Sequence, residues 1–547
     1  MKTHPTGTRR FLAVGSALLL AAAATIFLAA RPVAACGPTH GGGGGHWGGG
    51  QGGWCCEAGL TEWLADDNDW SVDENWDNGV PTFRRIARID NWGTANVLAP
   101  AAFADELQLG YADLSGGTVV IHPGAALATC GDQLVGIAAD GTILQIGGEN
   151  RLFCGELLLG IADTASGTYA MDDGILYAQG QTIGVAGIGS FYQAAGCNTA
   201  AAGLTIAAEA TSFGSYAMDG GALSVSRDEI IGDQGIGAFY QGGGIHAVWW
   251  GGVTLADGLD SQGAYTLAGG ELWVCGPVTA GRQGLASVEV LDGRMLIAGS
   301  FLLGEAADAT GTVTLGGGRL DVAGCEVIAA DGTAIFAQTG GVHTVRQSMA
   351  VGGAADSFAM VSILGGELLA RNLCIGTRGG MAMFDIADAD AAITVEDALV
   401  FGPDAYLTAA CGSTIVMAGG SVINLATDEY ALAGMDALAV VFDGRGRCWG
   451  WSSYEVAGTD LGPDAAGFLG NFALDALIVG GDAPARVVLR DCIDNGNRSP
   501  DAPEALYVHN LIVAPGSVLH LGGLDLYCDG ALDIQGDVVG GHVTPIP

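Results

Sequence analysis

The stretch GSYAMDGGAL at residues 214–223 returns as GAYTLAGGEL at residues 263–272. Related stretches fill much of the chain in two alternating forms, so that one form or the other occurs about every 24 residues. A fixed period of this length is typical of stacked-repeat proteins, because one short unit cannot bury its apolar face without neighbours. The repeat therefore decides the fold.

The motif itself predicts how each unit is built. In a strand, Tyr216 and Met218 would point to one side, and Ala217 and Asp219 to the other. The Gly-Gly pair that follows supplies the positive φ of a tight corner. A unit of about 24 residues with three short strands and glycine at its corners fits one coil of a parallel β-helix. We therefore predict an all-β chain.

A second landmark is an aliphatic residue, or Phe401 in the last copy, followed by Gly or Ala. Thirteen marks imply a rod of about 60 Å before its ends are added, since stacked strands lie about 4.8 Å apart. The alternative fold is a β-propeller with blades of about 48 residues. The half-period disfavours it, because the four strands of a blade occupy unlike environments. The marks are Leu109, Val135, Leu159, Ile183, Ile206, Ile231, Leu255, Ala280, Leu303, Ile328, Val351, Ile375 and Phe401.

Composition divides the chain into five segments. Residues 1–35 are expected to be a signal peptide, and residues 36–60 a flexible glycine-rich linker. Residues 61–104 are expected to form an N-terminal cap with the first strands, and residues 105–429 the solenoid. Residues 430–547 are expected to be a C-terminal β region, in which the repeat fades and short alternating strands return. Further coils followed by a cap are one interpretation of this region.

The leader predicts export. Lys2, Arg9 and Arg10 precede a long apolar stretch, and Cys36 follows small residues in a pattern that matches a bacterial lipidation signal. The apolar stretch is long enough that an uncleaved membrane anchor stays an alternative, and no second segment has that length. We expect a secreted or cell-surface protein.

The net charge of −39 restricts the partners. Such a chain repels phosphate backbones, so we expect no nucleic-acid partner. Scattered carboxylates serve above all to keep an apolar, glycine-rich β-protein soluble. The pairs Asp172-Asp173 and Asp228-Glu229 are expected to be solvated corners of this kind.

Three features together carry a resemblance. They are the entry segment with Asn75-Trp76 and Gly79-Val80-Pro81, the G-x-Y-x-L-x-G-G-x-L repeats, and the tail that begins SSYEVAGTDLGP at residue 452. The chain resembles exported β-helical repeat proteins of planctomycetes and related bacteria. Its repeats are also similar to autotransporter-associated β-strand passengers and pectin-lyase-like β-helices. The resemblance implies an extracellular β-helical protein, and it carries over no catalytic residue.

Few residues stand out as a candidate site. Asp385, Asp388 and Asp390 resemble a loop that could hold Ca²⁺, although they lack the glycine and terminal Glu of an EF-hand. In the pair Trp249-Trp250, adjacent strand residues face opposite sides, so one ring could stack on a sugar. Six of the 11 tryptophans lie between Trp47 and Trp92, and we expect them to plug the open end of the solenoid.

Two functions from different classes follow. The first is a non-enzymatic surface or matrix rod with a structural or adhesive role, which needs no cofactor and contacts extracellular polysaccharide or other surface components. The second is a polysaccharide lyase or hydrolase that works in a groove along the solenoid. Asp or Glu together with Arg on one face of three adjacent coils would favour the enzyme. Carboxylates spread around the corners would favour the rod. A third hypothesis is assembly driven by Ca²⁺.

Overall fold

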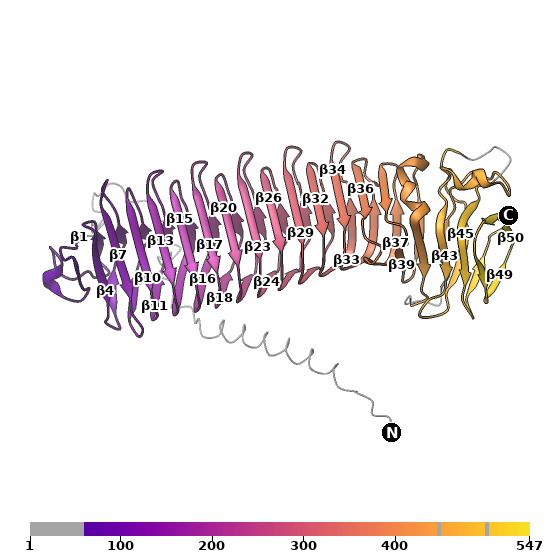
Figure 1. Ribbon diagram of the computed structural model, residues 1–547. Coiled ribbons are helices and arrows are strands. Elements are labelled where there is room, and N and C mark those ends of the chain that lie inside the picture. The colour runs from indigo at the N-terminus through magenta and orange to yellow at the C-terminus, as the bar shows by residue number, and fades with distance from the viewer. Residues whose placement is uncertain (1–58, 446–449, 498–502) are drawn as a thin grey trace, which may run out of the picture. The chain divides into compact units, whose positions relative to one another are not determined.

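The computed structural model describes residues 59–445, 450–497 and 503–547. The unit formed by residues 58–547 is a parallel β-solenoid of about 19 turns, each of about 24 residues (Figure 1). Strands one turn apart pair in parallel, as Tyr216 does with Phe191 on one side and with Phe239 on the other. The predicted β-helix is therefore confirmed. The propeller alternative is wrong, because its blades are antiparallel.

Most repeat turns contribute three strands, and in the others the second and third strands are continuous, as in β14 (Ile175–Ile183). In one turn, β17 (Phe213–Met218) belongs to a 15-stranded sheet, whereas β18 (Ala222–Val225) and β19 (Glu229–Ile231) belong to a 35-stranded sheet. The strands of the 15-stranded sheet are β2 (Asp67–Asp69), β4 (Gly93–Val97), β7 (Gly116–Ile121), β10 (Asp140–Gln145), β13 (Ser166–Met171), β15 (Ile188–Gln193), β17, β20 (Ile236–Gln241), β23 (Gln262–Leu267), β26 (Leu285–Val290), β29 (Thr310–Leu315), β32 (Thr333–Gln338), β34 (Phe358–Ile363), β36 (Met381–Ile386) and β38 (Ala405–Ala409).

The aliphatic-Gly mark is the corner that leads back toward the 15-stranded sheet. Positive φ follows all but the last of the 13 marks. A side chain is poorly tolerated there: a Cβ added at Gly232 would lie 2.1 Å from the backbone oxygen of Gln262. Three turns nevertheless use alanine in this left-handed conformation. The positive-φ residues are Gly110, Gly136, Gly160, Gly184, Ala207, Gly232, Ala256, Gly281, Gly304, Ala329, Gly352 and Gly376.

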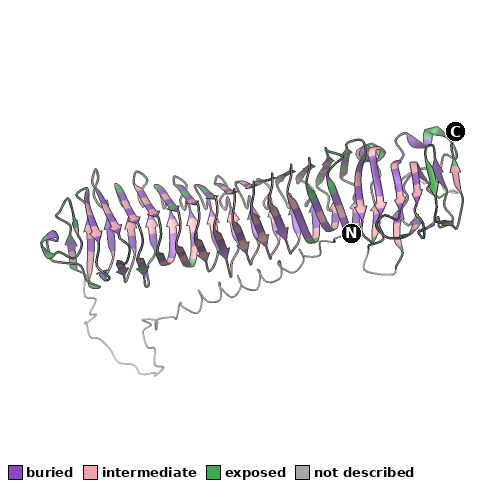
Figure 2. Ribbon diagram, turned by 60° about the horizontal axis from the view of Figure 1, so that its bottom comes forward, coloured by how far each residue is buried: buried purple, intermediate pink, exposed green. Residues whose placement is uncertain are grey.

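The interior follows the predicted alternation. Tyr216 and Met218 are fully buried, and Ala217 points outward. Figure 2 shows buried positions alternating with intermediate ones along the strands, with most exposed residues in the corners. Aromatic rings stack from turn to turn, with neighbouring ring centroids 4.5–4.9 Å apart, which matches the spacing of stacked strands. The stack comprises Tyr169, Phe191, Tyr216, Phe239 and Tyr265.

Polar side chains also enter this interior, in sets of four. Tyr265 donates its hydroxyl hydrogen to Gln241 (2.6 Å), and Nδ1 of His246 lies 3.1 Å from the same hydroxyl. Nε2 of His246 lies 2.8 Å from the carboxylate of Glu229, and neither side chain of that pair is exposed. Because Tyr265 donates to Gln241, it accepts from Nδ1, so a proton must lie between His246 and Glu229. Equivalent positions hold Gln133, Asn150, Gln145 and Tyr169, and then Gln181, Asn198, Gln193 and Tyr216.

The first turns confirm the tryptophan plug in part. Trp63, Trp70 and Trp76 are buried, and their rings make edge-to-face contacts with centroids 4.9 Å apart. Trp92 is instead 64% exposed. Trp47 and Trp54 lie outside the described residues. The plug therefore rests on three rings, which cover the apolar start of the stack.

At the other end, the stack continues through the region in which the repeat fades. In it, β41 (Leu438–Phe442), β43 (Leu474–Val479) and β45 (Leu506–Val513) pair in parallel, and β45 pairs onward with β47 (Leu526–Cys528) and β48 (Leu532–Ile534). Two 3-10 segments, η2 (Glu429–Ala437) and η3 (Ala465–Phe468), lie in the longer connections of these turns. The residues from Ala505 onward thus belong to the same solenoid.

Candidate functional site

A groove of about 1100 Å³ runs along the C-terminal half of the solenoid. It draws residues from β30 (Arg319–Val322), β33 (Val342–Val351), β35 (Glu367–Ile375), β37 (Ala392–Phe401), β42 (Ser452–Glu455) and β44 (Arg486–Arg490). These strands span about seven turns, so the groove is about 30 Å long. Its charged side chains are Arg319, Arg346, Arg371, Arg445, Arg486, Glu396 and Asp397.

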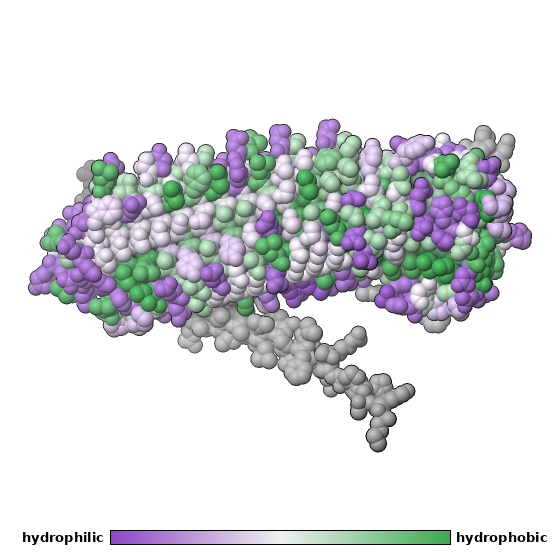
Figure 3. Space-filling view, in the orientation of Figure 1, coloured by the Kyte–Doolittle hydropathy of each residue, from purple (hydrophilic) through white to green (hydrophobic). Residues whose placement is uncertain are grey.

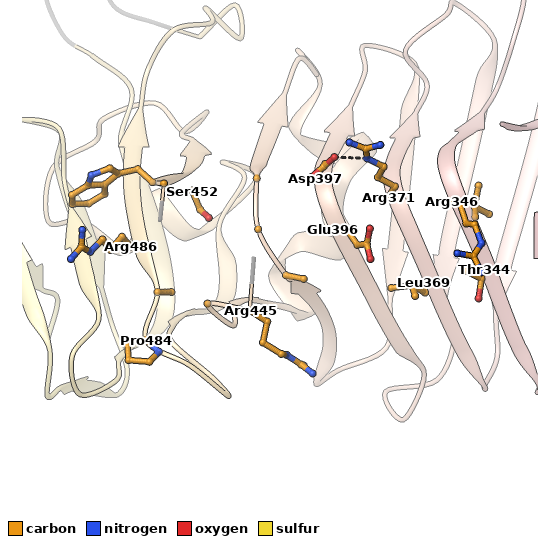
Figure 4. Close-up of a pocket in the computed structure, with 18 of the residues that line it drawn as sticks. Thr344, Arg346, Leu369, Arg371, Glu396, Asp397, Arg445, Ser452, Pro484 and Arg486 are labelled. Atoms are coloured by element: carbon orange, nitrogen blue, oxygen red, sulfur yellow. Dashed lines mark hydrogen bonds and ion pairs between the residues drawn. The ribbon is translucent and has the colours of Figure 1, made fainter. Parts of the chain in front are cut away.

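Figure 4 shows how these side chains are arranged. Arg346, Arg371 and the two carboxylates lie toward one end, Arg486 lies with Ser452 toward the other, and Arg445 lies between them. The lining between the two ends is small, with Ala418, Gly419, Gly420 and Gly444. Small residues leave the backbone accessible to a ligand that lies along the groove.

A β-bulged corner produces the charged end. The pairing of β33 with β35 shifts register after Val345, and that of β35 with β37 shifts after Ala370. The residues at these shifts point outward: Arg346 with Gln347, then Arg371, then Glu396 with Asp397. Bulges of this kind re-aim side chains away from a regular ladder. They bring arginine and carboxylate together on one corner of three consecutive turns.

The arginines of the groove differ in whether a carboxylate pairs with them and neutralises their charge. Arg371 pairs with Asp397 (2.6 Å), Arg319 with buried Asp321 (2.7 Å), and Arg445 with Asp443 and Asp482. Arg346 and Arg486 make no ion pair with any described residue. Two cationic groups are therefore available to a ligand, and five arginines against two carboxylates line the groove of a strongly acidic protein.

Asp321 organises the far rim of this groove. Burial alone would raise its pKa, but the hydrogen bonds and charges of Arg319 and Arg294 together hold the pKa of Asp321 below its usual value. Arg319 also donates to the hydroxyl of Thr344 at 3.4 Å. The Arg319 guanidinium is thus fixed by hydrogen bonds and presents a rigid donor at the rim.

Trp249 and Trp250 lie elsewhere, in the turn between β21 (Ile245–Val248) and β22 (Val253–Leu255). Trp250 is 81% exposed, whereas Trp249 is half-buried and donates its ring N–H to Ser224 (3.0 Å). The expectation that one ring of the pair is exposed is confirmed. Its role in stacking on a sugar stays a prediction.

Two of the three predicted calcium ligands accept hydrogen bonds from the protein itself. Asp385 accepts a hydrogen bond from Thr408 (2.6 Å), and Asp388 accepts one from the backbone N–H of Asp390 (3.0 Å). In the described part of the chain, no three His, Cys, Asp or Glu side chains converge as metal ligands would. The calcium site therefore stays a prediction without support from this geometry. Cys36 lies outside the described residues.

One expectation is wrong. Glu229 was expected to be a solvated corner residue, but it is the first residue of β19 and is fully buried against His246. Its neighbour Asp228 does serve the corner, where it accepts from the backbone N–H of Gly252 (3.0 Å). The error arose because the corner ends between Asp228 and Glu229. The sequence alone does not distinguish a carboxylate in the turn from one that begins the next strand and points inward.

Sequence reasoning also missed the arginine groove. A signal was present, since Arg294 and Arg319, and likewise Arg346 and Arg371, are 25 residues apart, about one turn. In a chain whose 20 cationic residues are far outnumbered by 59 acidic ones, such pairs mark a local positive row. Among the described residues, no helix is long and apolar enough to cross a membrane.

Comparison with known proteins identifies no relative: no family model, no curated protein and no solved structure matches this chain. The groove geometry is therefore the basis for assigning a function.

Proposed function

We propose that this protein is an exported, non-enzymatic rod of the cell surface or matrix that holds an acidic polysaccharide in its arginine-lined groove. The proposal includes kinship with exported bacterial β-helical repeat proteins, secretion through the leader, and an adhesive or structural role. The observation that carries it is a row of five arginines along about 30 Å of a protein with a net charge of −39. A solenoid supplies the stiffness that such a rod needs.

The chemistry of the groove supports an anionic polymer. A guanidinium presents a planar set of donors that matches carboxylate or sulfate groups in pairs. Arg346 and Arg486 lie at opposite ends of the groove, so an extended chain can contact both, whereas a small anion contacts one. Trp451, which is 46% exposed, adds an aromatic surface at the Arg486 end.

The test is binding of the purified protein to uronate-bearing, sulfated and neutral polysaccharides and to nucleic acid, with product release assayed in the same samples. We expect retention of the acidic polysaccharides without turnover, and weaker binding as salt rises. The variant R346Q/R486Q should bind at least about a hundredfold more weakly, since each of the two charge-assisted contacts contributes about 1.5–3 kcal/mol.

The matched control is Arg227→Gln. Arg227 is exposed, makes no ion pair with a described residue and lies outside the groove, so its loss should leave binding unchanged. Equal losses in R227Q and R346Q/R486Q would mean that only net charge matters. Preference for nucleic acid, or for neutral glycans, would overturn the proposal.

A second candidate function is a polysaccharide lyase or hydrolase. It is favoured by the bulged corner, where Arg346, Arg371, Glu396 and Asp397 lie on three consecutive turns. Release of unsaturated or reducing ends that is abolished by Glu396→Gln would replace the first proposal with this one.

A dependence on Ca²⁺ is tested on the same samples. If Ca²⁺ links carboxylates of the rod, a chelator should lower the melting temperature. An unchanged melting temperature would exclude a stabilising calcium ion, including one held by Asp385, Asp388 and Asp390.

A further inference from the structure

The outward face of the 15-stranded sheet is nearly free of charge. Each of the twelve strands from β7 to β36 presents three outward positions, and only Asp140, Glu289 and Asp385 among them are charged. In Figure 3 this side of the rod carries a pale lengthwise band of nearly neutral hydropathy. A soluble protein usually has about 25–35% charged residues on its surface. The face is therefore exceptional on a chain with a net charge of −39.

Exposed apolar side chains are concentrated on one part of this face. Ile188, Phe213 and Ile236 occupy the same register position on consecutive strands and are 51%, 53% and 39% exposed. Tyr192 and Tyr240 lie on the same strands at another outward position, 40% and 45% exposed. Single exposed apolar residues are ordinary, but an ordered row on adjacent strands marks an interaction surface.

We propose that this face pairs two copies of the chain. The pairing goes beyond the proposed function and does not depend on any ligand in the groove. With Phe213 on the two-fold axis of an antiparallel pair, the nine strands from β7 to β29 overlap. Nine strands about 4.8 Å apart, each about 20 Å long, offer roughly 900 Å² per partner, against about 800 Å² in a standard stable interface. The available area is therefore sufficient for a dimer.

Charge selects this face for self-association. The corners that flank it carry carboxylates such as Asp163 and Asp219, so two copies would repel one another if corner met corner. Face-to-face contact buries the uncharged rows and leaves these carboxylates at the solvent-exposed rim, where salt screens their repulsion. In an antiparallel pair with its two-fold axis along the strand direction, the row of Ile188, Phe213 and Ile236 meets its own copy, as an isologous interface requires.

The test is the sedimentation of the purified protein over a range of concentrations and salt. We expect a dimer that tightens as salt rises, because salt screens the repulsion between two acidic rods. The variant Phe213→Glu should weaken the dimer at least about a hundredfold, since the two-fold axis brings its two new charges together. Ile236→Glu should have a similar effect, since its charge would be buried against Ile188 of the second copy. Both residues are exposed, so the fold should persist, as circular dichroism would show.

The matched control is Ile175→Glu. Ile175 is 41% exposed, close to the 39% of Ile236, but it lies on β14 (Ile175–Ile183) of the other sheet. It should leave the dimer intact. A wild-type protein that stays monomeric at every concentration, or a dimer that Ile175→Glu weakens as much as Ile236→Glu does, would overturn the proposal. Polysaccharide binding weakens with salt whereas this association tightens, so the two proposals fail separately.

Discussion

Two turns of the solenoid, four turns apart, contain the same buried acid–base pair in different surroundings. Glu229–His246 and Glu326–His343 both have a 2.8 Å contact and no exposure. The first pair lies beneath Tyr265, whose hydroxyl contacts both His246 and Gln241. At the equivalent position above the second pair stands Val361.

The replacement leaves polar atoms without partners. Nδ1 of His343 and Oε1 of Gln338 make no hydrogen bond in the described structure. By contrast, two turns after the first pair all four equivalent positions are apolar. They hold Val278, Met295, Val290 and Val313. The difference teaches that a buried polar side chain in a solenoid depends on its neighbours one turn away, so the set is stable when it is wholly polar or wholly apolar.

The largest effect is expected from breaking the complete set. His246→Leu leaves the carboxylate of Glu229 buried without its partner, and should lower the free energy of unfolding by about 3–5 kcal/mol. The double variant E229Q/H246N reproduces the Gln181–Asn198 pair of two turns earlier and should recover most of this loss. Denaturant unfolding, with hydrogen exchange in β19 and β21, measures both. A double variant no better than His246→Leu would contradict the idea of interchangeable sets.

Repairing the incomplete set should have a smaller effect of opposite sign. Val361→Tyr would place a hydroxyl within reach of Gln338 and His343, between the rings of Phe336 and Phe384, much as Tyr216 lies between Phe191 and Phe239. The control is Val361→Phe, which adds the ring without the hydroxyl. We expect the tyrosine variant to be about 1–3 kcal/mol more stable than the phenylalanine variant in denaturant unfolding. Equal stability would mean that the unpartnered atoms carry no cost.

These sets also show what the sequence could predict. The positive φ at Gly221 of the Gly-Gly pair, and the shared side of Tyr216 and Met218, were predicted correctly, because positive φ and strand alternation are local properties. The sets were not predicted, because Tyr265 contacts Gln241 of the preceding turn and His246, which the repeat separates by 24 and 19 residues. Glu229 was predicted wrongly for the same reason, since its partner is known only once the turns are stacked.

The groove was likewise not located from the sequence. The sequence analysis named the residue types that an enzyme would need, arginine and carboxylate on one face of adjacent turns, but not where they would meet. Register shifts near Val345 and Ala370 place Arg346 and Arg371 on one corner, and a uniform repeat contains no such shifts. Only the structure therefore shows which residues of successive turns meet at an irregular corner.

Asp321 and its two arginines form a cluster at the rim of the groove, which solvent reaches. A substitution there shows whether loss of a polar partner costs as much stability as it does in the buried sets. Asp321→Asn should destabilise the protein by about 1–2 kcal/mol at neutral pH, a reduced value because Arg294 and Arg319 are over 40% exposed. A carboxyl whose folded pKa is depressed contributes stability above its unfolded pKa of about 4, and loses it as pH falls further. The difference between wild type and Asp321→Asn should therefore shrink below about pH 4 in unfolding measured as a function of pH. A difference that stays constant would assign the effect to packing.

The smallest effect is expected at the left-handed corner, which occurs both in turns with a polar interior set and in turns with an apolar one. Ala256 has a φ of 56° where most turns have glycine. Ala256→Gly relieves this left-handed strain, which costs about 1–2 kcal/mol. The lost methyl group and the greater freedom of glycine in the unfolded chain should cancel most of that gain. The free energy of unfolding should therefore change by less than about 0.5 kcal/mol. The control is Ala264→Gly, an outward residue of β23 in extended backbone, which should cost about 1 kcal/mol. Equal losses in denaturant unfolding would show that the corner tolerates alanine without strain. In that case the glycines at the other marks would reflect only the contact seen at Gly232, where the next turn leaves no room for a side chain.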